Sequence, residues 1–151
     1  RMESDPAWQP DFGPCRLHDT AGAVAIGARQ PLVAFNVNLR SNDLSVAKAI
    51  ARSIRQSNGG LPCVKAIGVA LASRGLVQVS MNLTDFRVTS IDAAFDAVKG
   101  EAERRGVCIA GSELIGLVPR AALAPATVPA VRLDRFDPMQ VLETRLAALG
   151  G

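Results

Sequence analysis

Two stretches of the chain carry an apolar residue at every second position, which is the period of a β-strand. They are residues 32–39 and 76–83. Most of the positions in between carry uncharged polar residues, namely Asn36, Asn38, Gln78, Ser80 and Asn82. Because successive side chains of a strand point to opposite faces, each stretch has one apolar face and one face of amides and hydroxyls. We therefore predict a sheet that packs one face on a core and turns the other toward a ligand or a partner domain, with a solvated face as the alternative.

The length and composition of the chain fit one globular domain with a substantial core. The chain has 151 residues, of which 48% are hydrophobic and 21% are charged. No apolar run approaches the ~20 residues that a membrane-spanning helix needs, so no membrane partner is predicted. The formal net charge of +3 mildly favours anionic ligands. The Lys and Arg residues are scattered, however, and this distribution does not indicate a nucleic-acid partner.

No complete catalytic or metal-binding set of residues is visible in the sequence. The three cysteines, Cys15, Cys63 and Cys108, are far apart and lack metal-ligand spacing, which predicts reduced thiols, a cytoplasmic location and no metal. His18 is the only histidine. A Cys15–His18 dyad would lack the third group that orients the base, so we assign it no catalytic role.

The order of the predicted elements is strand, helix, strand, strand, helix, strand. The strands are expected at residues 32–39, 64–71, 76–83 and 107–110, with a tight turn at 73–75. The helices begin after N-cap residues at 41–43 and 89–90 and end at the Asn-Gly-Gly of 58–60 and at Gly106. Their inner stripes are Leu44, Ala47, Ile50, Ala51 and Ile54 in the first helix and Ile91, Ala94, Phe95, Val98 and Ala102 in the second.

This order predicts an α+β protein with the ferredoxin-like βαββαβ fold. Right-handed crossovers place both helices on one side of the sheet and make the strands at 32–39 and 76–83 its central neighbours. The amide and hydroxyl side chains then converge on the middle of the helix-free face. This convergence favours a binding face over a merely solvated one.

The segments outside this unit are less regular. Residues 1–28 are rich in Pro and Gly, with a short strand expected at 23–26. Residues 111–119 follow the last predicted strand, and their one carboxylate, Glu113, should reach solvent or have a specific partner because burying it unpaired is costly. Pro119 begins a short helix through Leu123. A final helix starts around residues 137–140, and its apolar stripe should pack on the domain or on a neighbouring one; the stripe is Val141, Leu142, Leu146 and Leu149.

Several motifs, in order along the chain, resemble the glutamate formimidoyltransferase (formiminotransferase) family. They are PDFGP at 10–14, His18 with AGA at 21–23, GAR at 27–29, LVAFNVNL at 32–39, GGLP at 59–62, QVSMNL at 78–83 and GSELIGLVP at 111–119. The similarity runs from about Trp8 to Leu123. It implies the second, C-terminal subdomain of a two-subdomain transferase unit, with a junction loop at 1–28, the ferredoxin-like subdomain at 29–124 and a connector with a C-terminal helix at 125–151.

The resemblance also implies a function. Such an enzyme moves a formimino group from N-formimidoyl-L-glutamate to tetrahydrofolate, as co-substrate and without a metal, in histidine degradation. The family's catalytic histidine lies in the N-terminal subdomain, so this chain alone should hold no catalytic residue and be inactive. The partners expected are that subdomain and a second copy in a homodimer.

The resemblance implies that folate lies in a groove between the two subdomain sheets. The junction loop and the polar sheet face would line it. The residues expected to bind folate or substrate are Gly13, Pro14, Cys15, Arg16, Leu17, His18, Asp19, Thr20, Ala21, Gly22, Asn36, Asn38, Gln78, Ser80, Asn82 and Glu113. Asp19 departs from the family pattern, which commonly has proline there.

Two other readings use the same predicted fold. One is a stand-alone small-molecule-binding module without catalysis. The other is an RNA-binding module, which would stack bases on aromatic residues of the central strands. The open positions of these strands carry Asn, Gln and Ser instead, which disfavours RNA.

Overall fold

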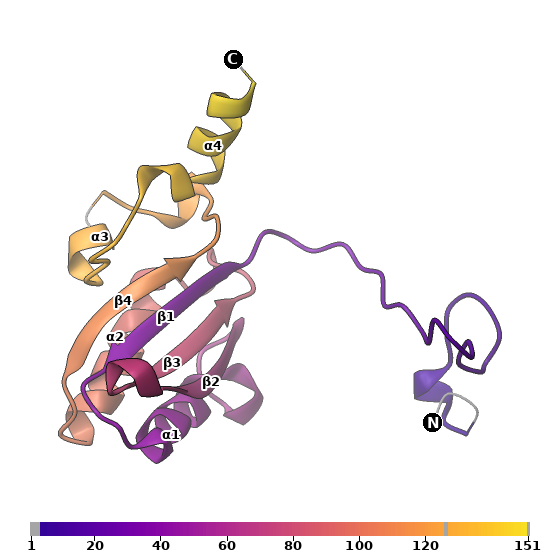
Figure 1. The fold of residues 1–151 in the computed structure, drawn as a ribbon, viewed down its shortest axis with the longest axis horizontal. Helices are drawn as coiled ribbons and strands as arrows, with labels where there is room; N and C mark the ends of the chain where they lie inside the picture. Colours follow the sequence, from indigo (N-terminus) through magenta and orange to yellow (C-terminus); the bar gives the residue numbers. More distant parts are fainter. Residues whose placement is uncertain (1–3, 126, 151) are drawn as a thin grey trace.

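A four-stranded antiparallel sheet forms the centre of the folded body (Figure 1). The structure is a computed structural model that describes residues 4–125 and 127–150, so the ends of the predicted junction and C-terminal segments and one connector residue lie outside it. The strands are β1 (Val33–Leu39), β2 (Val64–Leu71), β3 (Leu76–Leu83) and β4 (Ile109–Ile115). Their order in the sheet is β2-β3-β1-β4, which makes β1 and β3 the central pair as predicted.

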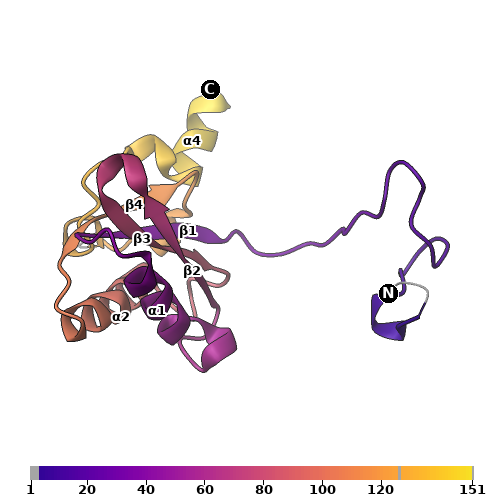
Figure 2. The same cartoon turned by 60° about the horizontal axis from the view of Figure 1, so that its bottom comes forward.

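Two helices cover one face of this sheet. They are α1 (Leu44–Ile54) and α2 (Ile91–Arg104), and Figure 2 shows both on the same side. The Asp43 carboxylate accepts from the Ser45 amide to cap α1, and the Ser90 hydroxyl accepts from the Ala93 amide to cap α2. The predicted α+β class with the ferredoxin-like arrangement is confirmed.

The core lies between the helices and the apolar faces of the strands. Every residue of the predicted inner stripe of α2 is buried, and so is every one of α1 except Leu44, which is half-buried. The alternate strand residues point at them, namely Val33, Phe35, Val37 and Leu39 of β1 and Val77, Val79, Met81 and Leu83 of β3. The turn between β2 and β3 is the 3-10 helix η3 (Ala72–Arg74), and Gly75, with a φ of +61°, ends it.

Helix α1 ends earlier than predicted. It stops at Ile54, and a separate 3-10 turn, η2 (Gln56–Asn58), leads to Gly59. The chain then passes close to the end of the helix, where a Cβ atom at Gly60 would lie 2.7 Å from the Ser53 carbonyl oxygen. The Leu61 amide donates to the Ile54 carbonyl at 2.9 Å, so the returning chain takes the bond that another helical turn would have made.

The last strand is longer than predicted and begins later. Strand β4 includes residues 111–115, which the sequence had suggested as a segment after the strand. Its outer edge is covered by a later part of the chain. The Ser112 amide donates to the Arg132 carbonyl at 3.0 Å, and the Gln140 side chain donates to the Leu114 carbonyl at 3.0 Å. These contacts come from far along the sequence, so the local pattern does not contain them.

The N-terminal arm, residues 4–32, leads away from the folded body (Figures 1 and 2). It begins with a 3-10 turn, η1 (Pro6–Trp8), and the strand predicted at 23–26 does not form. Those residues have no neighbouring strand to pair with, and a strand needs one to satisfy its backbone groups. A turn closes within the arm, where His18 and Gly22 exchange backbone hydrogen bonds of 3.2 and 3.1 Å.

The C-terminal segment contains η4 (Arg120–Ala122), α3 (Thr127–Ala130), η5 (Pro138–Gln140) and α4 (Leu142–Leu149). The expected helix after Pro119 is thus a single 3-10 turn, and Asp137 caps η5 rather than the final helix itself. Val141 is buried, but Leu146 and Leu149 are 58% and 73% exposed, so the outer part of α4 does not pack on the body. Within the described residues, no helix is long and apolar enough to cross a membrane.

Candidate functional site

The face of the sheet without helices, called the open face below, brings the predicted polar residues together. In the strand register Asn36 pairs with Ser80 on one side and Glu113 on the other. The next row joins Asn38 to Gln78 and Gly111, and the row before joins Ala34 to Asn82 and Ile115. From β2, Lys65, Ile67 and Val69 extend these rows. All six sheet residues predicted to bind a ligand therefore share one face.

The centre of the open face is deeply set although no helix covers it. Asn36, Asn38 and Gln78 are 7%, 4% and 6% exposed. Ser80 and Glu113 are half-buried and Asn82 is exposed. Figure 2 shows the β2–β3 turn rising on the side of the sheet opposite α1 and α2, so the hairpin itself shelters part of this face. Polar groups buried to this extent need hydrogen-bond partners.

One amide connects three strands. The Gln78 side-chain nitrogen donates to Asn38 Oδ1 at 2.8 Å and to Glu113 Oε1 at 2.5 Å. Glu113 therefore has the specific partner that the sequence left open. A donor shared by an amide oxygen and a carboxylate fixes the orientation of both, and the bond to the charged acceptor is the stronger one. Gln78, Asn38 and Glu113 form what we call the amide network.

Asn36 is different, because it lies beside the network without joining it. No hydrogen bond to its carboxamide is found in the described part of the chain, and its amide atoms reach solvent, because no fully buried side-chain nitrogen or oxygen there lacks a partner. The side chain is nonetheless more than nine-tenths buried, and its strand position directs it to the open face between Ser80 and Glu113. A carboxamide held in this way keeps both its donors and its acceptor for another molecule.

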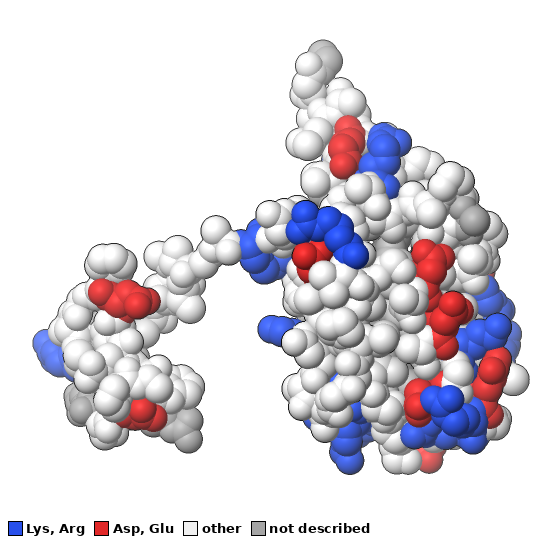
Figure 3. Space-filling view, turned by 180° about the vertical axis from the view of Figure 1, so that it is seen from behind, with Lys and Arg blue, Asp and Glu red and all other residues white. Residues whose placement is uncertain are grey.

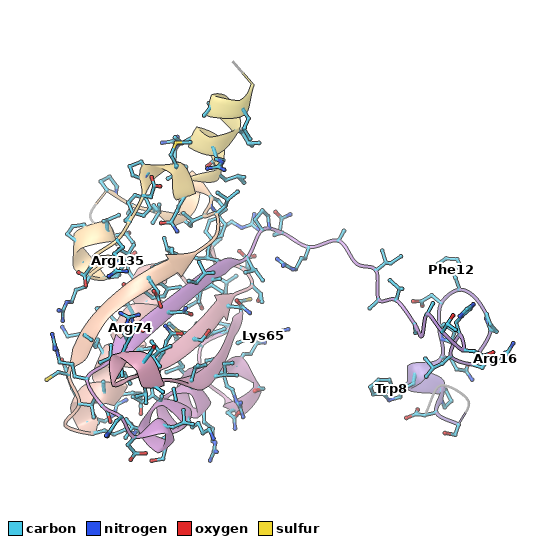
Figure 4. The ribbon with its side chains drawn as sticks, in the orientation of Figure 1. Trp8, Phe12, Arg16, Lys65, Arg74 and Arg135 are labelled. Carbon is cyan, nitrogen blue, oxygen red and sulfur yellow. The ribbon has the colours of Figure 1, made fainter. Side chains whose placement is uncertain are left out.

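The structure adds residues that the sequence analysis did not select. A Cβ atom at Gly111 would lie 2.5 Å from an Asp134 carboxylate oxygen, so the absence of a side chain at Gly111 admits Asp134 to the rim of the open face. An isolated glycine inside a strand is the sequence signal for such a close approach. Figure 4 places Arg74 from η3 and Arg135 beside the sheet, with Lys65 at the β2 edge. Cationic side chains therefore surround a centre that is mostly neutral.

The predicted junction-loop residues, 13–22, do not join the sheet residues in this structure. They lie on the N-terminal arm, where Figure 4 shows Phe12 and Arg16 far from the folded body. The loop has a shape of its own: His18 Nδ1 accepts from the Thr20 and Ala21 amides at 3.3 and 3.2 Å, and a hollow of about 400 Å³ adjoins it. The role of these residues in binding stays a prediction.

Metal-ligating side chains do not gather anywhere in the described residues. No group of three or more His, Cys, Asp or Glu has a suitable arrangement there. Cys15, Cys63 and Cys108 are free thiols. His18 uses Nδ1 within its own turn, and the structure shows no contact of His18 with Cys15. The open face can orient a ligand through amide, hydroxyl and carboxylate groups, but the one histidine of the chain, His18, is not among its residues.

Comparison with known proteins agrees with this geometry. The formiminotransferase domain matches residues 34–136, which contain the sheet apart from Val33 and both covering helices. Glutamate formimidoyltransferase of Streptococcus pyogenes serotype M1 is 46% identical over 146 residues, which are 96% of this chain and 48% of that protein. The Thermoplasma acidophilum protein of the same name is 43% identical over 92% of this chain and 46% of its own length. Formimidoyltransferase-cyclodeaminase of Mus musculus is 41% identical over 79% of this chain and 23% of its own length.

The chain thus spans about half the length of the glutamate formimidoyltransferases it matches. The matched residues include both central strands apart from Val33, and the rim position Asp134. The open face therefore lies within the matched region. The chain belongs to the formiminotransferase domain family.

Proposed function

We propose that this chain is the folate-binding half of a glutamate formimidoyltransferase. The complete enzyme transfers the formimino group of N-formimidoyl-L-glutamate to tetrahydrofolate in the cytoplasm, during histidine degradation. Residues 29–124 form the binding subdomain, 1–28 the junction and 125–151 the connector and helix. The observation that carries the proposal is the neutral, deeply set open face with the unpaired carboxamide of Asn36.

The chemistry of the open face suits these reactants. A pterin ring presents alternating N–H donors and carbonyl or ring-nitrogen acceptors, which side-chain carboxamides can match in pairs. Asn36, Ser80 and Asn82 have the groups for this on neighbouring strands. Both reactants also carry the carboxylates of a glutamate, and Lys65, Arg74 and Arg135 at the rim are suited to hold them.

The reaction requires that a cation and a nucleophile be held together. The folate amine attacks the amidinium carbon and a new C–N bond forms. The bond from that carbon to the glutamate nitrogen then breaks, and the proton that the folate amine loses ends on this nitrogen. Glu113, half-buried and fixed by Gln78, offers a carboxylate that attracts the amidinium. Orientation of this kind contributes to the rate because it removes the entropy cost of bringing the groups together.

The proton transfers are assigned to the other half of the enzyme. The family resemblance puts the catalytic histidine in the N-terminal subdomain, and such a group contributes roughly two to four orders of magnitude in rate. The junction loop at 13–22 would close over the ligand once both halves are present. A homodimer stays a further prediction.

The test measures binding and turnover separately. By calorimetry, the chain should bind tetrahydrofolate, and Asn36→Ala should weaken that binding by about tenfold, the scale of one hydrogen bond in a buried site. Asn42→Ala is the matched control, because Asn42 is exposed just before α1 and its substitution removes the same kind of amide from another surface.

Turnover is then followed as loss of N-formimidoyl-L-glutamate. The chain alone should show none, and adding the N-terminal half of the Streptococcus pyogenes relative should produce it. Turnover by the chain alone would contradict the divided site. Folate binding that Asn36→Ala and Asn42→Ala affect equally would contradict the open face as the site, and tight binding with no turnover in the mixture would favour a stand-alone binding module.

A further inference from the structure

The two edges of the sheet differ in how their backbone groups are used. At β4 the outer edge is covered, because the Ser112 amide and the Leu114 carbonyl bond to residues 132 and 140. Just before β2, the Thr84 amide donates to the Cys63 carbonyl at 2.8 Å, and this bond shows which residues of β2 direct their backbone groups toward β3. Antiparallel bonding alternates along a strand, so the N–H and C=O groups of Val64, Ala66, Gly68 and Ala70 point away from β3.

These outward groups of β2 are open to another molecule. Across the described ranges 4–125 and 127–150, no hydrogen bond reaches the outer N–H and C=O groups of Ala66, Gly68 or Ala70. Two hollows of about 530 and 440 Å³ run beside this edge and share Arg55, Ala66 and Ile67 in their walls. Such a row of unused donors and acceptors is a template for one more strand.

Both sides of this edge are basic. Lys48 and Arg52 are four residues apart on one stripe of α1, and Arg55 follows directly after the helix; all three lie beside the edge. Lys65 lies on the other side, on the open face (Figure 4). We call these four residues the basic edge. None of them forms an ion pair within the described residues, and neither hollow is lined by Asp or Glu.

The surface around the basic edge keeps this positive character. In Figure 3, the lower left of the folded body carries Lys and Arg without Asp or Glu beside them, whereas both signs are mixed on the right. Ile67 is 60% exposed next to Lys65 and adds an apolar contact. The edge therefore offers backbone bonds, positive charge on both sides and one hydrophobic position.

We propose that the outer edge of β2 binds an extended acidic peptide segment of a partner protein as an added strand. Alternate side chains of that strand would point toward the α1 stripe and toward Lys65 and Ile67. Acidic residues at the first set of positions would then meet Lys48, Arg52 and Arg55, while acidic and apolar residues at the second set would meet Lys65 and Ile67.

Other occupants fit less well. A second copy paired through β2 would bring two basic edges together, and like charges opposed across strands are destabilising. A nucleic acid would gain no stacking, because the walls of the two hollows contain no aromatic residue. A small anion would leave the row of backbone groups unused. The acidic strand uses the charge and the backbone groups together.

The test uses a fluorescein-labelled decapeptide of alternating Glu and Val, with a Lys–Val decapeptide for comparison. Fluorescence anisotropy with the whole chain should show binding of the acidic peptide only, weaker at high salt. Arg52→Glu should weaken it by about fivefold or more, as expected when a contact at a charged interface is reversed. Arg145→Glu on α4 makes the same change of charge away from this edge and should leave binding unchanged.

A second measurement tests the added strand itself. On peptide binding, hydrogen exchange at the Ala66 and Gly68 amides should slow, because these amides would become donors to the peptide. Ala70→Pro removes one outward donor at an exposed edge position and should weaken binding without disturbing the ladder to β3. The proposal is wrong if the peptide fails to bind, if Arg52→Glu and Arg145→Glu behave alike, or if peptide binds while exchange at Ala66 and Gly68 is unchanged.

Discussion

Replacing Gln78 by methionine should destabilise the fold measurably, because one side chain holds the amide network together. Methionine is of similar length but has no N–H donor. The change leaves the oxygen of Asn38 without its donor in a site where that side chain is 4% exposed. An unsatisfied buried polar group costs about 1–3 kcal/mol. The substitution also removes the hydrogen bond to Glu113, but that side chain is half-buried, so water can replace much of the lost bond.

The expected decrease in the free energy of unfolding is therefore about 2–3 kcal/mol, dominated by Asn38. Urea unfolding followed by far-ultraviolet circular dichroism would measure it. Tryptophan fluorescence is unsuitable, since Trp8 lies in the N-terminal arm and not near the sheet (Figure 4). Ser80→Ala is the matched control on the same face of β3, where no described hydrogen bond uses the hydroxyl, and its effect should stay within about 0.5 kcal/mol.

A double substitution would separate the two bonds. Combining Gln78→Met with Glu113→Met, which has no amide or carboxylate acceptor, should show a coupling energy of about 0.5–3 kcal/mol, because the residues are in contact. If Gln78→Met costs no more than Ser80→Ala, the amide network contributes nothing to stability. The bonds of Gln78 would then not be what stabilises the buried polar centre.

Three further predictions concern packing, charge and the open face. Gly68→Ala should destabilise the fold by about 1–3 kcal/mol, because the new Cβ would lie 2.7 Å from the Ala47 carbonyl carbon in α1. Gly100→Ala, inside α2, has room for the added methyl group and should stabilise the fold by roughly 1 kcal/mol. Thermal unfolding of both variants checks this. Hydrogen bonds from Ser45 hold the pKa of Asp43 below its usual 3.8. The contribution of the Asp43 carboxylate to stability is therefore present above that pH and is lost as the pH falls through the lowered pKa. Asp43→Asn, which can still cap α1, should lose less stability on acidification, as measured by unfolding at several pH values. Asn36→Val should leave the chain as stable or more stable while tetrahydrofolate binding falls, and a loss of stability would show that Asn36 is structural.

The central part of the fold could be predicted because the sequence pattern and the tertiary environment agree there. Strands β2 and β3 begin and end where the sequence indicated, and all the predicted inner residues of α2 are buried. Each of these elements packs one apolar face on a single core, so its apolar residues recur with a period of 2 in the strands and 3.6 in the helices. The order of the strands follows from the handedness of the crossovers, which does not depend on side-chain detail.

The parts that could not be predicted depend on contacts between residues far apart in sequence. The apolar run of β4 stops at Gly111, Ser112 and Glu113, yet the strand continues. Its polar residues are satisfied by Gln78 and by the segment around Arg132, neither of which is near in sequence. Helix α1 ends early for a similar reason, because the chain returning through Gly60 occupies its last turn.

The position of the junction loop could not be predicted for a related reason. Residues 13–22 form no described hydrogen bond or ion pair with the sheet, and their turn is closed by bonds within the loop, between His18 and Gly22 and from the Thr20 and Ala21 amides to His18 Nδ1. A loop that binds between two subdomains has its partner surface only when both are present. The two glutamate formimidoyltransferases that this chain matches are about twice as long as it is.

The two asparagines of β1 show which residues of the open face are needed for the stability of the fold and which are not. Asn38 is 4% exposed and receives a hydrogen bond from Gln78, so the fold satisfies it internally. Asn36 is 7% exposed, is directed to the same face and has no such bond among the described residues. No fully buried side-chain nitrogen or oxygen among the described residues lacks a partner, so the Asn36 amide atoms reach solvent, and a valine at this position would suit the strand equally well. Stability therefore accounts for Asn38 but not for Asn36. Asn36 is thus a solvent-reached carboxamide that the fold itself does not use, and this supports the proposal that the open face, rather than a hollow elsewhere on the surface, binds the folate.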